Sequence, residues 1–424
     1  MEFFRDSRPP KRRPKHGYPL ATDGTNLYAG GFFAFAGRTN ASYIARFDGI
    51  AWQPLGAGLN NQVAALAVTN NLVYAGGFFT ATANGQPLTH IGCWDGTNWN
   101  SLGDPGGLVY ALALGPNGLY VAGTYYTGTA YGSPYFNRWD GTNWNGVISF
   151  APGTTLFAVP LSDPVGYDAI AIQGTNVYLG GNITGFTQFD PNVGLDPATN
   201  CQNIIRFDGT YGWIMNTGLN RTNVAVTALG TNLFAAGSFT SAGGVAANQI
   251  ARWNGNVWSG VGGGVVGGGT VLALATMGND LYAGGSFTNL GGVTANRIAK
   301  WDGTNWSALG NGISGVVQSL AAVGSDLYAG GTFRFAGNKN SYNLARWNEQ
   351  LNFNIPELLD AAQSTNGQFH VRLAGIGGLT NYIQATTNFS TWMPILTNTE
   401  GIYDFTDPAS PGYRFRYYRA VLGP

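Results

Sequence analysis

The sequence predicts an all-β protein: a seven-bladed β-propeller of four-stranded blades, followed by a small β-sandwich. Three observations predict this fold. A motif of about 46 residues recurs seven times. Each copy carries signals for four strands, and the composition (65 Gly, 13% aromatic and only 10% charged residues) is typical of short strands joined by glycine turns.

The second strand of each copy carries the clearest part of the repeat. Residues 27–31 (LYAGG) return almost unchanged at 73–77 (VYAGG). An aromatic residue anchors this strand in every copy: Tyr28, Tyr74, Tyr120, Tyr178, Phe234, Tyr282 and Tyr328. Eight residues earlier lies an apolar residue among small ones, which predicts a first strand that is almost entirely apolar. Small side chains place that strand innermost, where the blades crowd around the axis.

The third and fourth strands are joined by an Asp-Gly turn, as at Asp302-Gly303. Glycine at such a turn supplies the positive φ that a tight hairpin needs. A tryptophan follows in six copies: Trp52, Trp99, Trp144, Trp213, Trp258 and Trp306. These large side chains predict an outermost fourth strand, and we expect them and the anchor aromatics to pack between blades.

A basic residue precedes the aromatic of the third strand in six copies: Arg46, Arg138, Arg206, Arg252, Lys300 and Arg346. Its neighbour two positions on is Asp or Asn. A residue repeated around a ring is more typical of structure than of a single catalytic site. We therefore expect it to form an ion pair or hydrogen bond that holds blades together.

With its double glycine, basic-aromatic-Asp turn and Trp, the repeat resembles the kelch and galactose-oxidase central-domain group of propellers. It is also similar to the propeller repeats of bacterial secreted proteins and of fungal cell-polarity markers. The resemblance covers residues 18 to about 355 and rests on structural residues, so it implies a fold and not an activity.

The seventh copy is incomplete. It has no tryptophan at the equivalent position, where Phe353 is a possible substitute. Two segments can supply its missing fourth strand: residues 350–356, or residues 2–4, which would clasp the ring by joining both chain ends. The sequence leaves both alternatives open.

The sequence divides into three parts. Residues 1–17 form a basic tail rich in Arg, Lys and Pro, which we expect to be disordered; residues 18–356 form the propeller, and residues 357–424 the sandwich. The last part alternates like strands of an antiparallel sandwich. Its segments 385–392 (ATTNFSTW) and 417–420 (YYRA) resemble immunoglobulin-like C-terminal modules of bacterial secreted proteins, which implies an exported protein.

No catalytic motif emerges from the chain. His16, His90 and His370 lie too far apart in the predicted fold to share a metal, and Cys93 and Cys201 occupy non-equivalent positions in different repeats. The sequence lacks a Gly-x-Ser-x-Gly elbow, a P-loop and a His-Glu-x-x-His motif. We therefore expect no catalytic residue, no metal and no cofactor.

The global charge also limits the partners. Lys and Arg together number 21, as do Asp and Glu, so nothing points to nucleic acid. There is no apolar run of membrane-spanning length and no secretory signal pattern. We expect a monomer that binds a glycan or a protein.

The copies differ most in the connections between the second and third strands and between successive blades. In an antiparallel blade these connections share one face, and the longest fall around blades three and four. Variable loops on a rigid scaffold are where function concentrates. Aromatic and acidic residues there form the predicted ligand site: Tyr125, Tyr126, Tyr131, Tyr135, Phe186, Phe189, Asp190 and Asp196.

The function predicted is a non-catalytic secreted or cell-surface binding protein that recognises a glycan or a protein through this face. One alternative is a hydrolase or lyase with an active site at the mouth of the propeller channel. Another is an intracellular scaffold, which the basic tail and the missing signal peptide favour.

Overall fold

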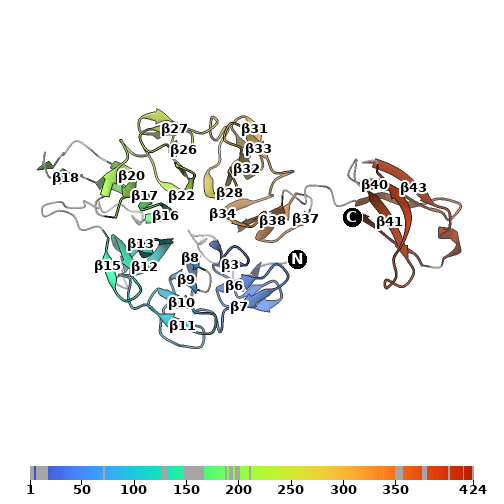
Figure 1. Cartoon of the computed structure of the whole chain (residues 1–424), viewed down its shortest axis with the longest axis horizontal. Coiled ribbons are helices and arrows are strands. Elements are labelled where there is room, and N and C mark those ends of the chain that lie inside the picture. The colour runs from blue at the N-terminus through green and yellow to red at the C-terminus, as the bar shows by residue number, and fades with distance from the viewer. Residues whose placement is uncertain are drawn as a thin grey trace. The chain divides into compact units, whose positions relative to one another are not determined.

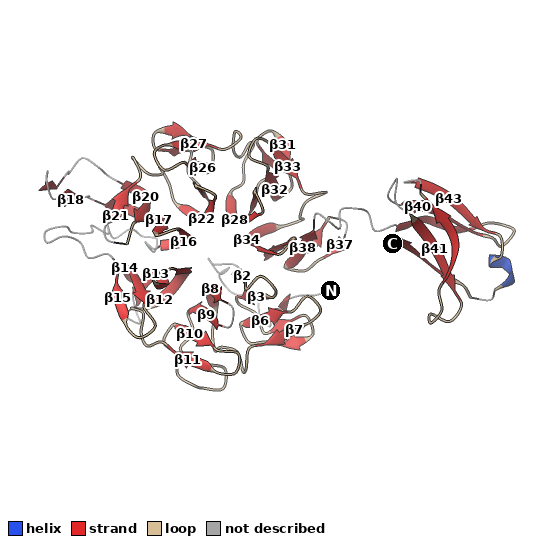
Figure 2. Cartoon of the chain, viewed as in Figure 1, coloured by secondary structure: helices blue, strands red, loops and turns tan. Residues whose placement is uncertain are grey.

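The structure, a computed structural model, divides into two compact units, Met1–Arg346 and Trp347–Pro424, which are described separately. It describes residues 4–5, 18–69, 72–126, 131–147, 167–186, 189–190, 194–195, 201–209, 212–337, 339–348, 357–374, 380–399, 402–413 and 415–422. Strands form nearly all of its regular structure (Figure 2), so the predicted all-β class is confirmed.

The first unit contains a series of antiparallel sheets that we number 1 to 7 along the chain. Sheet 1 consists of β2 (Leu20–Thr22), β3 (Leu27–Gly30), β6 (Ile44–Phe47) and β7 (Trp52–Pro54). Sheet 2 consists of β8 (Val63–Thr69), β9 (Leu72–Gly77), β10 (Ile91–Trp94) and β11 (Trp99–Ser101). Sheet 3 consists of β12 (Leu108–Gly115), β13 (Gly118–Tyr126), β14 (Tyr131–Trp139) and β15 (Trp144–Gly146).

Sheets 4 to 6 repeat this order. Sheet 4 consists of β16 (Tyr167–Gln173), β17 (Asn176–Phe186), β20 (Cys201–Phe207) and β21 (Gly212–Ile214). Sheet 5 consists of β22 (Asn223–Leu229), β23 (Asn232–Gly237), β26 (Ile250–Trp253) and β27 (Trp258–Gly260). Sheet 6 consists of β28 (Val271–Met277), β29 (Asp280–Gly285), β32 (Ile298–Trp301) and β33 (Trp306–Ala308).

Sheet 7 has three strands among the described residues: β34 (Val316–Val323), β35 (Asp326–Thr332) and β38 (Leu344–Asn348). Residues 350–356 and Phe353, expected to complete it, lie outside the described residues. Of the other candidate, residues 2–4, only Phe4 lies among the described residues. Phe4 belongs to β1 (Phe4–Arg5), which pairs with β4 (Phe35–Ala36) in the connection of sheet 1, so a clasp at this residue is contradicted.

The first strands of successive sheets lie toward the centre of the unit and contact one another (Figure 1). The series returns to its start, because β2 also contacts β34. The Ser319 hydroxyl donates a hydrogen bond to the Tyr18 carbonyl (2.5 Å), and one apolar cluster contains residues of both sheets 1 and 7. The unit is therefore an all-β, propeller-like arrangement with its first and last sheets in contact.

Four of the six tryptophans donate hydrogen bonds to a neighbouring sheet or its linker, as predicted, whereas the Trp213 indole donates to Asp208 of its own sheet. The indole N–H of Trp99 in sheet 2 donates to the carbonyl of Leu55, which follows sheet 1 (3.0 Å). Equivalent bonds run from Trp258 to Met215 (2.9 Å) and from Trp306 to Val261 (3.3 Å). A buried indole that finds a backbone acceptor adds direction to the apolar packing between sheets.

The repeated basic residue has a different role from the one predicted. Lys300 forms an ion pair with Asp280 (2.8 Å) inside sheet 6, and Arg346 forms one with Asp326 (3.6 Å) inside sheet 7. Arg46 donates to the side chain of Gln53 inside sheet 1. For these contacts the prediction of links between blades was wrong, because the register places each partner on an adjacent strand of the same sheet.

Short hairpins fill several connections between second and third strands. They are β4 with β5 (Thr39–Asn40), β18 (Phe189–Asp190) with β19 (Gly194–Leu195), β24 (Ser241–Ala242) with β25 (Val245–Ala246), β30 (Asn289–Leu290) with β31 (Val293–Thr294), and β36 (Phe335–Ala336) with β37 (Lys339–Asn340). In sheet 3, β13 and β14 instead extend and pair directly as far as Tyr126 and Tyr131.

The second unit contains two three-stranded sheets. One is β39 (Glu357–Gln363), β40 (Phe369–Ala374) and β43 (Ile402–Asp407); the other is β42 (Met393–Asn398), β41 (Asn381–Thr386) and β44 (Tyr417–Leu422). Val371, Leu373 and Ile383 form a buried cluster with partly buried apolar residues from both sheets.

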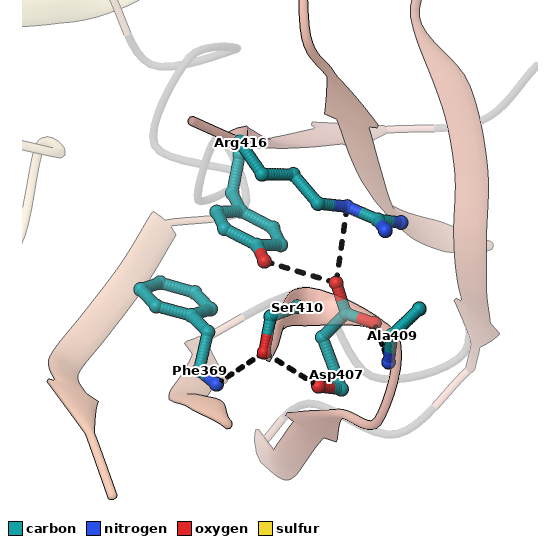
Figure 3. Close-up of polar contacts among 6 residues, drawn as sticks. Phe369, Asp407, Ala409, Ser410 and Arg416 are labelled. Atoms are coloured by element: carbon teal, nitrogen blue, oxygen red, sulfur yellow. Dashed lines mark hydrogen bonds and ion pairs between the residues drawn. The ribbon is translucent and has the colours of Figure 1, made fainter. Parts of the chain in front are cut away.

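One short helix lies among the described residues of this unit, η2 (Ser410–Gly412). Figure 3 shows the polar network around it: Asp407 accepts from the hydroxyl of Tyr418 (2.9 Å) and pairs with Arg416 (3.1 Å). The Ser410 hydroxyl donates to the Asp407 carbonyl (2.8 Å) and accepts from the Phe369 N–H (2.6 Å). This network ties the start of β44 to β40 and β43.

Candidate functional site

Two kinds of connection meet at one edge of the seven sheets, which we call the loop edge. They are the segments between second and third strands and the linkers from each sheet to the next. Isolated bridges join a linker to the connection of the following sheet, pairing Leu59 with Thr82, Leu219 with Ala242, Val265 with Leu290, and Ile313 with Ala336. Both kinds of connection therefore share an edge, as the antiparallel order predicts.

The loop edge is held rigidly where these segments meet. The side-chain oxygen of Asn60 accepts hydrogen bonds from the backbone N–H groups of Thr80 (3.0 Å) and Ala81 (3.2 Å). Asn220 accepts equivalent bonds from Thr240 (2.9 Å) and Ser241. Side chains displayed on this edge are thus positioned by a hydrogen-bonded backbone.

A pair of tyrosines stands at the loop edge of sheet 3. Tyr125 is 48% exposed, and its ring lies 5.5 Å from that of Tyr135, which is 4% exposed. The Tyr135 hydroxyl lies 3.2 Å from the carbonyls of both Gly107 and Leu108, to which it can donate. The buried Tyr135 thus supports the Tyr125 ring from the protein side, and the other side of the Tyr125 ring is exposed to solvent.

Further aromatic residues extend this pair toward sheet 2. The rings of Phe78 and Tyr110 lie 5.9 Å apart, and the buried Thr124 hydroxyl donates to the Tyr110 hydroxyl (3.3 Å). Any side chain at position 106 would be crowded, because a Cβ added to Gly106 would lie 3.3 Å from Tyr125 and 3.4 Å from Tyr135. The linker therefore packs closely against the two tyrosines.

Asp104 borders these tyrosines, and His90 interacts electrostatically with Asp104. The exposed carboxylate of Asp104 accepts from the Gly106 N–H (2.9 Å). Burial lowers the pKa of His90 below its ordinary value, and the negative charge of Asp104 opposes that shift. Burial also raises the pKa of Tyr135 well above its ordinary value, with Asp104 adding to the effect. The lowered pKa favours the neutral imidazole of His90, and the raised pKa favours the protonated phenol of Tyr135.

The predicted site residues are distributed unevenly. Tyr126 and Tyr131 pair with each other through their backbones at the end of the sheet 3 hairpin. In sheet 4, Phe186 pairs with Cys201, and Phe189 and Asp190 belong to the hairpin β18–β19. Asp196 lies outside the described residues. Tyr125 and Tyr135 are the predicted pair whose side chains the structure brings into contact, and Tyr135 is buried.

A second regularity of the loop edge was not visible in the sequence. In five sheets the residue before the third strand has a left-handed backbone without being glycine, with φ from 60° to 68°: Tyr43, His90, Gln249, Arg297 and Asn343. In sheet 4 the same conformation occurs at Asn203 (φ 65°), near the start of β20. In the other five sheets the carbonyl of the left-handed residue accepts a hydrogen bond from a backbone N–H at the end of the second strand. The donor is the second glycine of the Gly-Gly pair or its equivalent, as in Gly285 N–H to the Arg297 carbonyl (3.0 Å). The backbone is constant while the side chains differ.

The first strands also contain functional candidates that the sequence reading missed. Each of six sheets has a register shift near the start of its first strand, at Ala64, Tyr110, Asp168, Val224, Leu272 or Gln318. The expectation of an almost entirely apolar first strand was wrong at Asp168 and Gln318. These residues could have been found from the sequence by aligning the copies. Tyr110, Asp168 and Gln318 occupy the position that is Ala64 in the second copy.

Within the described ranges, no helix has the length and apolar character to cross a bilayer. The same residues contain no group of three or more His, Cys, Asp or Glu side chains placed to hold a metal ion.

Comparison with known proteins finds weak structural likenesses. No family model and no curated protein matches the sequence, so the resemblance to kelch-type repeats rests on its motif alone. A solved structure of the GH74 xyloglucanase from Xanthomonas campestris has a TM-score of 0.46 and 14% identity over 86% of this chain. This chain covers 58% of the length of that enzyme.

A second solved structure is described as a glycoside hydrolase. Its alignment covers 96% of this chain and 94% of that chain, with a TM-score of 0.29 and 10% identity. Neither likeness is close enough to assign a family, a substrate or a catalytic residue to this chain.

Proposed function

We propose that the protein binds glycans through the loop edge of a closed seven-bladed β-propeller formed by residues 18–356. The contacts between β2 and β34 and the shared core of sheets 1 and 7 support closure. In this proposal residues 1–17 are a basic tail and residues 357–424 a β-sandwich. The immunoglobulin-like character of that sandwich stays a prediction.

The exposed Tyr125 ring, supported by Tyr135, is the observation that carries the proposal. A sugar ring has apolar C–H faces and hydroxyl edges, so it binds well to an aromatic face beside polar groups. Tyrosine combines an apolar ring with a polar tip and loses little conformational freedom on binding. Asp104, which borders the pair, is suited to accept hydrogen bonds from sugar hydroxyls.

The constant left-handed positions add support. A non-glycine residue in this conformation costs about 1–2 kcal/mol. Glycine is abundant in this chain, with 65 residues, yet these six positions carry five other residue types. Retaining varied side chains on a fixed backbone is what a recognition surface requires.

Glycan hydrolysis is a second candidate, which one observation favours. Asp168 brings a carboxylate to the start of the inner strand β16, and β16 contacts β12, which carries Tyr110. Glycosidases need two carboxyl groups on either side of the scissile bond. Asp104 and Asp168 are the acids to test, and a lyase or hydrolase at the channel mouth would depend on at least one of them.

Localisation and assembly follow as proposals. A glycan-binding propeller with an appended sandwich suits an extracellular or cell-surface protein, and we propose that it acts as a monomer. An intracellular scaffold with a protein ligand is the outcome to be expected if no glycan binds.

The test is a glycan array with the purified full chain, followed by titration of the tightest ligand. Tyr125→Ala should weaken binding about tenfold, in line with the value of an aromatic contact. Phe335→Ala is the matched control, because Phe335 is 46% exposed at the loop edge of sheet 7. Equal affinity of wild type and Tyr125→Ala would refute the site.

An assay for new reducing ends in the same ligand distinguishes a protein that only binds the glycan from one that hydrolyses it. Turnover that disappears in Asp168→Asn, with binding retained, would replace the non-catalytic proposal by the hydrolase. Binding without turnover supports the non-catalytic reading.

A further inference from the structure

The second unit carries an exposed aromatic surface that the proposed function does not use. It lies on the outer face of the sheet β42–β41–β44 and beside it, and we call it the sandwich face: Gln384, Phe389, Trp392, Tyr417 and Arg419. Tyr418 and Ala420, the alternate residues of β44, join the core of the unit instead. The alternation of β44 thus directs Tyr417 and Arg419 outward.

The members of the sandwich face contact one another. The rings of Phe389 and Tyr417 lie 4.0 Å apart, and Trp392 meets Phe389 edge-on at 6.3 Å. The Arg419 guanidinium lies 4.3 Å from the centre of the Trp392 ring, and its Nε donates to Gln384 (2.9 Å). The result is a continuous aromatic surface with a positive charge on it.

These apolar groups remain open to solvent. Phe389 is 61% exposed and Tyr417 39% exposed. Exposed aromatic groups that gather in one place, rather than being scattered singly, mark interaction sites.

The turn that displays Phe389 is rigid. The Thr386 hydroxyl accepts from the N–H groups of Asn388 (3.2 Å) and Phe389 (3.1 Å), and the Asn388 side chain accepts from Ser390 (3.0 Å) and Thr391 (3.1 Å). Phe389 itself has φ of 61°, an unfavourable backbone for a bulky residue. The aromatic side chain is therefore kept at a position where glycine would be less strained.

The other side of the face is fixed by the network around Asp407. Its ion pair with Arg416 and its bond to Tyr418 hold the first residues of β44 (Figure 3), and Tyr418 also stacks on Phe369 at 4.0 Å. Tyr417 lies between these two anchored residues in the sequence. Both sources of the face, the turn and the strand, are thus ordered before any ligand arrives, which reduces the entropic cost of binding.

The charge of the face selects the ligand chemistry. Among the described residues Arg419 has no carboxylate partner: the ion pairs of this unit are Arg372 with Asp404 and Arg416 with Asp407. Arg419 is exposed and its guanidinium retains donors beyond the bond to Gln384. A guanidinium beside aromatic rings is suited to a carboxylate attached to a ring with apolar faces.

We propose that the sandwich face binds a polysaccharide that carries carboxylate groups. Trp392, Phe389 and Tyr417 contact the faces of the sugar rings, and Arg419 pairs with a uronate carboxylate. This site is separate from the loop edge and does not depend on the glycan proposed to bind there.

The test uses the full chain and polygalacturonate, with methyl-esterified polygalacturonate as a neutral ligand of the same backbone. Wild type should bind the acid form more tightly, and its affinity should fall as salt is added. Trp392→Ala should weaken binding to both forms about tenfold. Arg419→Gln should remove the preference for the acid form while retaining binding to the ester.

Control variants separate this site from general damage. Tyr403→Ala removes an aromatic side chain of similar exposure (38%) from β43, in the other sheet, and should bind like wild type. Trp392→Phe keeps a ring and should retain most of the affinity. Tyr125→Ala should also bind polygalacturonate normally, so failure at the loop edge and failure here give different results.

The proposal is overturned if the wild-type chain does not bind polygalacturonate, if Trp392→Ala binds it unchanged, or if Arg419→Gln keeps the acid preference. Concentration-dependent dimerisation of the wild type that Trp392→Ala abolishes, without polygalacturonate binding, would assign the face to a second copy of the chain instead.

Discussion

At the scale of single residues, six side chains at the loop edge share a backbone conformation that disfavours them. Arg297 has φ of 66° and makes no ion pair among the residues that the structure describes. Gln249 differs, because its side-chain amide donates to the carbonyl of Gly269 (2.8 Å) in the next linker. The side-chain hydrogen bond of Gln249 thus offsets part of its backbone strain, whereas the Arg297 side chain makes no such bond among the described residues.

The strain at Arg297 gives a prediction that compares two truncations. Arg297→Gly should be about 1 kcal/mol more stable than Arg297→Ala, because both lose the side chain and only alanine keeps the left-handed penalty. Urea unfolding of both variants measures the difference. At Arg252, a strand position of sheet 5, the order should reverse, since glycine destabilises a strand. The same order at both positions would show that Arg297 is unstrained.

At the scale of elements, the turn between third and fourth strands is a repeated hydrogen-bonded unit. Asp140 accepts from the N–H groups of Thr142 (2.9 Å) and Asn143 (2.8 Å), and from the Asn145 side chain (2.8 Å). These bonds hold the pKa of Asp140 well below its ordinary value. In sheet 5 Asn254 makes the same two backbone bonds without a charge.

This depressed pKa predicts the direction of a pH effect. A carboxyl with a lower pKa in the folded state stabilises the fold above its unfolded pKa of about 3.9, and that contribution is lost as the pH falls toward the folded value. Asp140→Asn should therefore lose less stability between pH 5 and pH 2 than wild type. The reciprocal variant Asn254→Asp should lose more. Parallel pH profiles of denaturation midpoints for all three proteins would contradict this account.

The elements also show what a sequence can reveal and what it cannot. The hairpins and the packing of Trp99 between sheets were predictable, because Asp-Gly turns and large aromatic residues recur at fixed spacing. The partners of Lys300 were not, since an ion pair depends on cross-strand register. The left-handed position was hidden because its six positions carry five different residue types, so no single residue marks the repeat.

The candidate site was predictable to a similar degree. Loop variation pointed to sheet 3 and to Tyr125, but nothing in a row of tyrosines indicates that Tyr135 is buried beneath its neighbour. His90 and Asp104 were missed because they belong to sheet 2 and to the linker after it. Only the packing between sheets brings Asp104 within electrostatic range of both Tyr135 and His90.

At the scale of the whole molecule, the first unit combines a repeated scaffold with one distinctive sector. Recurring residues account for strands, turns and the joints between sheets, as in other repeat architectures. Departures from the repeat collect at the loop edge of sheets 2 to 4, where Tyr110, Tyr125 and Asp168 replace small or apolar residues. The proposed glycan site thus lies where the copies of the repeat differ most from one another.

Hydrogen exchange of the full chain, with and without the tightest glycan from the array, tests this central claim most directly. The account predicts slower exchange in residues 104–110, 122–126 and 131–137 and no change at the opposite edge, around the turns at Asp95, Asn117 and Asp302. Protection confined to that opposite edge, or no protection anywhere in the first unit, would contradict it.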